Sequence, residues 1–110
     1  MNLANLPIDE APSRYIVGID LGTTNSAVCY VDTESPDRIV NSFPVVQLTA
    51  PGQVEARDTL PSFHFQPTRV DGHEKALALP WQAKAADHVV GMMARDEGAL
   101  APGRLIASAK

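Results

Sequence analysis

Two short runs of β-branched and aromatic residues, separated by a few small polar residues, constrain how this chain begins to fold. The first run spans residues 15–21 and the second spans residues 27–31. Such runs favour extended strands, and the segment between them, Gly22–Ser26, is rich in small side chains with hydroxyl groups. The pattern predicts a β-hairpin with a loop of about four or five residues.

The remainder of the chain predicts a mixed α/β unit. Residues 38–43 fit a third strand that extends the hairpin into a meander, and residues 59–65 alternate as a further strand. Residues 51–58 carry a glycine and three charged side chains and are expected to form a loop. An irregular insertion is expected at residues 66–84. The apolar residues of 85–100 recur at three- and four-residue spacing, which predicts a helix.

The composition is unfavourable for a self-sufficient hydrophobic core. The chain has 110 residues, which is about one small domain, but it contains only six aromatic residues and nine prolines. Aromatic side chains bury the most area per residue and prolines interrupt regular elements, so the core must come from Val, Ile, Leu, Met and Ala. We therefore expect an incomplete folding unit, preceded by a flexible arm at residues 1–14.

Charge and hydropathy exclude several classes of protein. The formal net charge of −4 offers no basic surface for nucleic acid or for an anionic membrane. The single cysteine, Cys29, cannot form an intramolecular disulfide and indicates a reducing compartment. No apolar run approaches the roughly 20 residues that span a bilayer, and residues 1–7 lack the features of a signal peptide. We expect a soluble, cytoplasmic protein with no nucleic-acid partner and no membrane partner.

The candidate chemistry lies at the hairpin turn. Asp20 is near the end of the first predicted strand, and Gly22 lets the backbone turn two residues later. Backbone N–H and hydroxyl groups of Thr23 and Thr24 can converge on phosphate oxygens. Because Asp20 and a phosphate are both anionic, the pair requires Mg²⁺ between them, and Mg²⁺ commonly keeps several water ligands. On composition alone, an ordinary hairpin turn is the alternative interpretation.

Four segments resemble one known family. The turn is neither a Walker phosphate loop nor a dinucleotide fingerprint. Residues 15–31 resemble the first phosphate-binding hairpin of actin-like ATPases and sugar kinases, and Gly-Ile-Asp-Leu-Gly-Thr-Thr-Asn-Ser is similar to the 70-kilodalton heat-shock chaperone family in its bacterial DnaK type. Three later segments match that family in order: Thr59–Phe63, Val90–Arg95 and Pro102–Lys110.

The resemblance implies a fold, cofactors and site residues. The implied fold is α/β, a partial actin-like (ribonuclease H-like) ATPase lobe in residues 15–110, with an N-terminal hairpin or meander, an additional strand and one or two helices. The implied cofactors are ATP or ADP and Mg²⁺. Asp20 would hold the hydrated metal, and Lys110 would assist the attack of water on the γ-phosphate, so these two are the implied catalytic residues. The phosphates would be held by Gly22, Thr23, Thr24 and Asn25.

The resemblance also implies an activity for an intact protein of which this chain is the N-terminal fragment. That protein would hydrolyse ATP to drive binding and release of unfolded polypeptide clients, assisted by cochaperones, and the chain alone is expected to be inactive. The alternatives are a fragment of an actin-superfold sugar kinase and a non-catalytic remnant. The segments Thr59–Phe63 and Pro102–Lys110 favour the chaperone. Residues 45–58 and 66–84 are longer than the family pattern, which indicates a divergent branch.

Other chemically reactive side chains favour structural interpretations. Cys29 lies inside a predicted strand and is expected to be a small buried hydrophobe. Met92 and Met93 are expected to fill the core beside a helix. The three histidines share no metal-ligand spacing, so no zinc site is expected; they are His64, His73 and His88.

Overall fold

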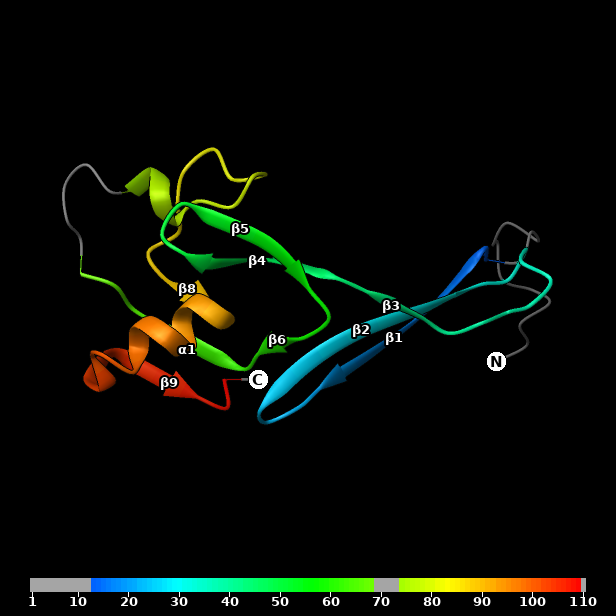
Figure 1. The fold of residues 1–110 in the computed structure, drawn as a ribbon, viewed down its shortest axis with the longest axis horizontal. Helices are drawn as coiled ribbons and strands as arrows, with labels where there is room; N and C mark the ends of the chain where they lie inside the picture. The colour runs from blue at the N-terminus through cyan, green and yellow to red at the C-terminus, as the bar shows by residue number, and fades with distance from the viewer. Residues whose placement is uncertain (1–12, 69–73, 110) are drawn as a thin grey trace, which may run out of the picture.

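The structure is a computed structural model that describes residues 13–68 and 74–109. Of the predicted arm at residues 1–14, all but the last two lie outside these ranges. The described chain is elongated, with principal extents of 54 × 29 × 27 Å. Figure 1 shows the reason: a long hairpin made of β1 (Tyr15–Leu21) and β2 (Asn25–Asp32) projects from the rest of the fold. We call this second part, which consists of residues 45–68 and 74–109 and contains the helix, the body. The fold is mixed α/β, as the sequence predicts, and its strands pair antiparallel.

The hairpin is the one predicted from the two β-branched runs. β1 and β2 pair antiparallel, starting with Tyr15 opposite Asp32. β3 (Asn41–Phe43) pairs with β2 and completes the expected meander, although it is shorter than the predicted strand at 38–43. At the end of the hairpin farthest from its turn, the Arg14 guanidinium bonds to Asp32 and lowers the pKa of that carboxyl. The pair is solvent-exposed and contributes little stability.

β1 is exposed along its whole length. Its side chains alternate between the two faces of the sheet, with Ile16 on one face and Val17 and Ile19 on the other. These three side chains are 62%, 58% and 66% exposed. A strand with apolar side chains on both faces is typical of a sheet that is covered on both sides. The described part of the chain therefore leaves apolar sheet surface uncovered.

A second hairpin contradicts one prediction. β4 (Val45–Ala50) pairs antiparallel with β5 (Gln53–Arg57). The expected loop at residues 51–58 is wrong, because only its first two residues form a turn and most of the rest forms β5. Two of the three charged side chains that suggested a loop, Glu55 and Arg57, lie on β5, where they are exposed and charge carries no penalty.

The predicted strand at residues 59–65 is divided between two sheets. β6 (Leu60–Pro61) pairs with β2 of the long hairpin. β7 (Phe63–Phe65) instead lies in the body, between β8 (Val89–Val90) and β9 (Leu105–Ala107). Ser62, which lies between β6 and β7, hydrogen-bonds to Gly22 and Thr24 at the turn end of the long hairpin. This short stretch of chain therefore joins the hairpin to the body.

The helix is shorter than predicted. α1 spans Met92–Gly98 rather than residues 85–100, because Val89 and Val90 pair with β7 as a strand. Gly91 then adopts φ 88° and ψ −145°, a conformation that is essentially restricted to glycine and that starts the helix abruptly. Among residues 13–68 and 74–109, the other helical turns are two 3₁₀ segments, η2 (Glu74–Leu77) and η3 (Pro102–Arg104). Within the described ranges, no helix is long and apolar enough to cross a membrane.

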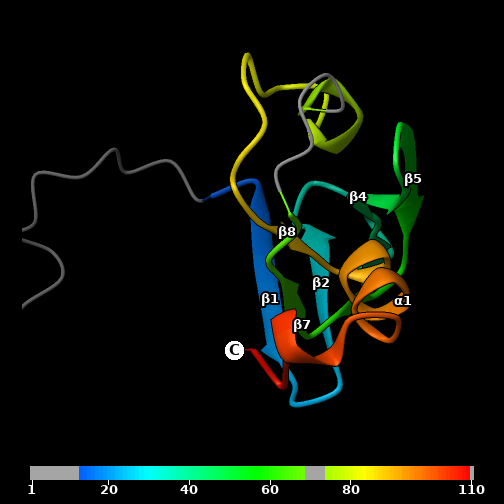
Figure 2. The same cartoon turned by 90° about the vertical axis from the view of Figure 1, so that its left-hand side faces the viewer.

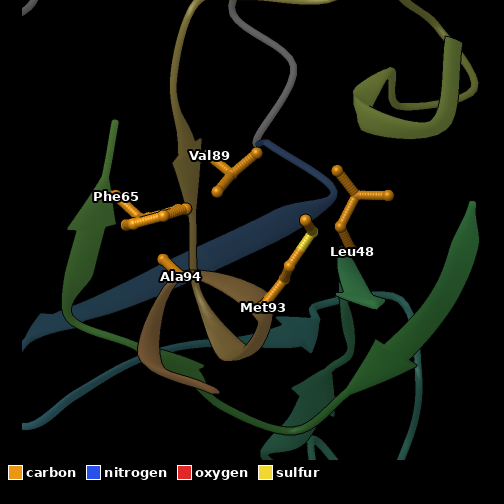
Figure 3. Close-up of a cluster of buried hydrophobic side chains, with 5 residues drawn as sticks. All are labelled: Leu48, Phe65, Val89, Met93 and Ala94. Atoms are coloured by element: carbon orange, nitrogen blue, oxygen red, sulfur yellow. The ribbon is translucent and has the colours of Figure 1, made fainter. Parts of the chain in front are cut away.

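A small aliphatic core holds α1 against the sheets. The buried residues come from β4, β7, β8 and α1, and each is at most 8% exposed. Figure 3 shows the cluster, which consists of Leu48, Phe65, Val89, Met93 and Ala94. Four of the five are the aliphatic and methionine types expected from the composition. Met93 fills the core as predicted, whereas Met92 is only half-buried and lies outside this cluster. Beneath the helix N-terminus, the buried Gln47 amide accepts the Met92 N–H at 3.0 Å and donates to the Thr59 carbonyl at 2.9 Å.

The start of α1 gives a first testable prediction. Gly91→Ala is expected to lower the free energy of unfolding by about 2 kcal/mol or more, because its Cβ would strain the backbone and approach Leu60 and Gln47. Urea denaturation followed by circular dichroism measures the loss. Gly103→Ala, where a Cβ meets only open space, is the control and should change stability by less than about 0.5 kcal/mol. Equal effects of the two substitutions would contradict this account of Gly91.

Candidate functional site

The predicted phosphate turn lies at the tip of the long hairpin. The last residue pair of the β1–β2 register is Leu21 opposite Ser26, which leaves four residues, 22–25, between the paired strands; the last of them, Asn25, is the first residue of β2 and pairs with Pro61 of β6. This four-residue turn agrees with the predicted loop length. Thr23 and Thr24 are exposed there, so their side-chain hydroxyl groups are accessible to a ligand.

The turn requires glycine at its first position. A Cβ on Gly22 would collide with the backbone carbonyl oxygen of Asn25. The turn therefore closes more tightly than any side chain allows, and its ends lie close together.

Asp20 stands two residues before this turn and is exposed. It pairs with Ala27, so by strand alternation it lies on the face opposite Ile19 and Leu21. Within the described ranges, no group of three or more His, Cys, Asp or Glu side chains is placed to hold a metal ion. A hydrated Mg²⁺ that also binds phosphate needs only one or two carboxylates, and Asp20 beside the turn fits that donor set.

Ser62 connects the turn to the body. Its backbone N–H donates to the Thr24 carbonyl at 2.9 Å, and its hydroxyl donates to the Gly22 carbonyl at 2.7 Å. The Ser26 hydroxyl lies 3.2 Å from the Ser62 hydroxyl. Ser62 is 4% exposed, so these bonds are protected from water. Ser62 lies in the segment Thr59–Phe63, which resembles the chaperone family, but the sequence predicts no role for this residue.

The C-terminal segment reaches the same place. Ala109 donates its N–H to the Ser62 carbonyl at 2.9 Å. Figures 1 and 2 both show the end of β9 beside the tip of the long hairpin. The predicted catalytic residue Lys110 lies outside the described residues. Its neighbour Ala109 and the turn residue Thr24 are both hydrogen-bonded to the backbone of Ser62.

A cavity in the body has a different character. It has a volume of about 210 Å³ and is lined mainly by apolar side chains of β4, Leu77, Leu79 and Trp81. Two of its polar groups already have partners, since Gln47 caps α1 and the Gln82 side chain accepts the Leu79 N–H at 2.9 Å. The cavity is therefore mainly apolar, whereas a phosphate site needs several donors that converge from one side.

The remaining reactive side chains make structural contacts. Cys29 is a half-buried free thiol within β2. The rings of His64 and His88 stack with centroids 4.8 Å apart, and His88 hydrogen-bonds to Asp87 and thereby lowers the pKa of that carboxyl. Lone pairs lie in the ring planes, so two stacked rings do not converge on one metal ion. His73 lies outside the described residues.

Known proteins give no further guidance for this site. No family model, curated protein or solved structure matches the chain. The functional interpretation therefore rests on the geometry of the turn and of the segments that meet there.

The tight turn gives a second testable prediction. Gly22→Ala is expected to displace the Asn25 carbonyl and to weaken the bond between Ser62 and residue 22, because both depend on the missing Cβ. Two-dimensional amide NMR should show a shifted Ser62 resonance and an unchanged core resonance for Met93. Thr23→Ala, which alters an exposed side chain, is the control and should leave the Ser62 resonance in place. An unshifted Ser62 resonance in Gly22→Ala would show that the turn tolerates a side chain.

Proposed function

We propose that this chain is the N-terminal part of the nucleotide-binding domain of a chaperone ATPase similar to the 70-kilodalton heat-shock family. One observation carries the proposal: the four segments that resemble this family, although far apart in sequence, are joined by hydrogen bonds. Ser62 bonds to the turn and to Ala109, and the Phe63 carbonyl accepts the Gly91 N–H at 3.2 Å. Unrelated matches have no reason to meet at one place.

The proposed fold is the first portion of an actin-like lobe. The meander of β1, β2 and β3 is the expected start of such a lobe. The apolar side chains on both faces of β1 favour a strand that lies inside a larger sheet, covered by polypeptide beyond the 110 residues. The same start would suit a sugar kinase. The sequence segments that resemble the chaperone rather than the sugar kinase are Thr59–Phe63 and Pro102–Lys110. Ser62 and Ala109, one from each segment, are hydrogen-bonded to each other, which favours the chaperone.

The proposed chemistry assigns roles to residues at the turn. N–H and hydroxyl groups of Gly22, Thr23, Thr24 and Asn25 would donate to the terminal phosphate oxygens of ATP. Asp20 would hold water ligands of Mg²⁺, which offsets the charge of the phosphates when bound. Lys110 would stabilise negative charge at the γ-phosphate and orient the attacking water. In the intact protein, hydrolysis would drive binding and release of unfolded polypeptide clients with the help of cochaperones.

A titration of the chain with Mg-ATP tests the phosphate site. Only one side of the proposed site is present, so we expect weak binding, with a Kd of about 1 mM, seen as amide shifts confined to residues 22–26. Asp20→Asn should abolish the magnesium dependence of these shifts, because an amide of similar shape lacks the charge. Asp37→Asn makes the same charge change at an exposed position in the turn after β2, and it should preserve the magnesium dependence of the shifts.

Two results would contradict the proposal. An absence of shifts at residues 22–26 in the unmodified chain would return the hairpin to a structural role. Binding in the micromolar range, about −8 kcal/mol, would show that the site is complete rather than partial.

The proposed role of Lys110 is testable in a longer chain that carries the rest of the domain. Lys110→Ala is expected to lower the single-turnover hydrolysis rate by about 100- to 1,000-fold, because one donor to developing charge is lost. ATP affinity should fall far less, since the interaction acts mainly in the transition state. Lys84→Ala, at an exposed position, is the control. Equal hydrolysis rates in Lys110→Ala and the unsubstituted domain would remove Lys110 from the mechanism.

A further inference from the structure

The contact between the two serine hydroxyls has a defined direction. The single hydroxyl proton of Ser62 goes to the Gly22 carbonyl, because a carbonyl oxygen only accepts. The Ser26 hydroxyl must therefore donate to Ser62 Oγ, 3.2 Å away. The result is a chain of hydrogen bonds from Ser26 through Ser62 to Gly22. In a partly buried setting each bond of such a chain polarises and strengthens the next.

The same residue controls two carbonyl groups of the turn. Ser62 binds the Gly22 carbonyl through its hydroxyl and the Thr24 carbonyl through its backbone N–H. Carbonyl oxygens carry partial negative charge and repel phosphate, whereas a phosphate-binding turn must direct N–H groups toward the anion. By holding both carbonyls toward the buried segment between β6 and β7, Ser62 keeps these two acceptors away from the exposed side chains of Thr23 and Thr24.

Ser62 also sets the position of the C-terminal segment. Its carbonyl accepts the Ala109 N–H, so a single buried residue holds both the turn and the neighbour of Lys110. Displacement of Ser62 would change the turn and this segment together.

We infer that Ser62 is a positioning residue for phosphate binding, which orients the turn carbonyls away from the anion without itself touching it. This inference rests on the proposed function of the turn. The hydroxyl is the part of Ser62 that acts on Gly22, so its removal should impair phosphate binding even where the backbone bonds to Thr24 and Ala109 persist.

The test compares four substitutions in the full 110-residue chain, with Mg-ATP as the probe. Ser62→Ala removes the hydroxyl, Ser62→Cys keeps nearly the same size but is a weak donor, and Ser62→Thr keeps the hydroxyl. Ser42→Ala is the matched control, because Ser42 is an exposed serine whose hydroxyl bonds to Asp58 at 3.3 Å. The readouts are amide hydrogen exchange at residues 23–26 without ligand and the amide shifts of these residues at one subsaturating Mg-ATP concentration.

We expect Ser62→Ala and Ser62→Cys to reduce the Mg-ATP shifts by about tenfold, the equivalent of roughly 1.4 kcal/mol, and to accelerate exchange in the turn. Exchange of the core amide of Met93 should stay unchanged. Ser62→Thr and Ser42→Ala should behave like the unsubstituted chain. If Ser62→Ala fails to fold, the comparison of Ser62→Cys with Ser62→Thr gives the same information.

The outcomes separate the inference from the proposed function. Shifts of normal size in Ser62→Ala or Ser62→Cys would overturn the positioning role of Ser62 and leave the phosphate site intact. An absence of Mg-ATP shifts in the unsubstituted chain would overturn the proposed function and this inference with it. Equal losses in the cysteine and threonine variants would also overturn the inference, because the hydroxyl would then be irrelevant.

Discussion

The structure depends on a change of partner strand at Pro61 and Ser62. Pro61 has no N–H group, so the β6 ladder with β2 cannot continue through it by a backbone donor. One residue later, Ser62 directs its N–H to the hairpin turn, and β7 continues in a different sheet. The long hairpin and the body are held together at this change of partner. The candidate phosphate-binding turn and the C-terminal segment meet there.

The body itself is held by few interactions. α1 has seven residues, which is too short to be stable without tertiary contacts. Its stability comes from five buried side chains and from the Gln47 amide, which satisfies an N–H at the helix start and also binds the segment before β6. A buried amide with partners on both its oxygen and its nitrogen fixes where the helix begins relative to the sheets. The helix thereby helps to position the segment that contains Ser62.

The distribution of apolar surface distinguishes the two parts of the molecule. The body buries a cluster of five apolar side chains and exposes others, such as Leu100 and Ile106, whereas every residue of β1 is exposed and its apolar residues lie on both faces. Burial of a large aliphatic side chain stabilises a protein by about 1.5 to 3 kcal/mol. The exposed apolar side chains of β1 do not contribute this stabilisation in the described part of the chain. We interpret the hairpin as a strand pair shaped for a larger sheet, which fits the proposed partial lobe and the weak nucleotide binding expected of it.

Local patterns in the sequence were sufficient to predict the hairpin, its short turn, the third strand and the aliphatic core, because strand alternation and turn composition depend on neighbouring residues. They also marked Asp20 and residues 22–25 as a candidate site. The helix start, β5 and the role of Ser62 were decided only by tertiary structure. Val89 and Val90 fit a helical pattern equally well until β7 is available as a partner, and a serine hydroxyl gains a specific role only when the chain brings a carbonyl from 40 residues away within 2.7 Å.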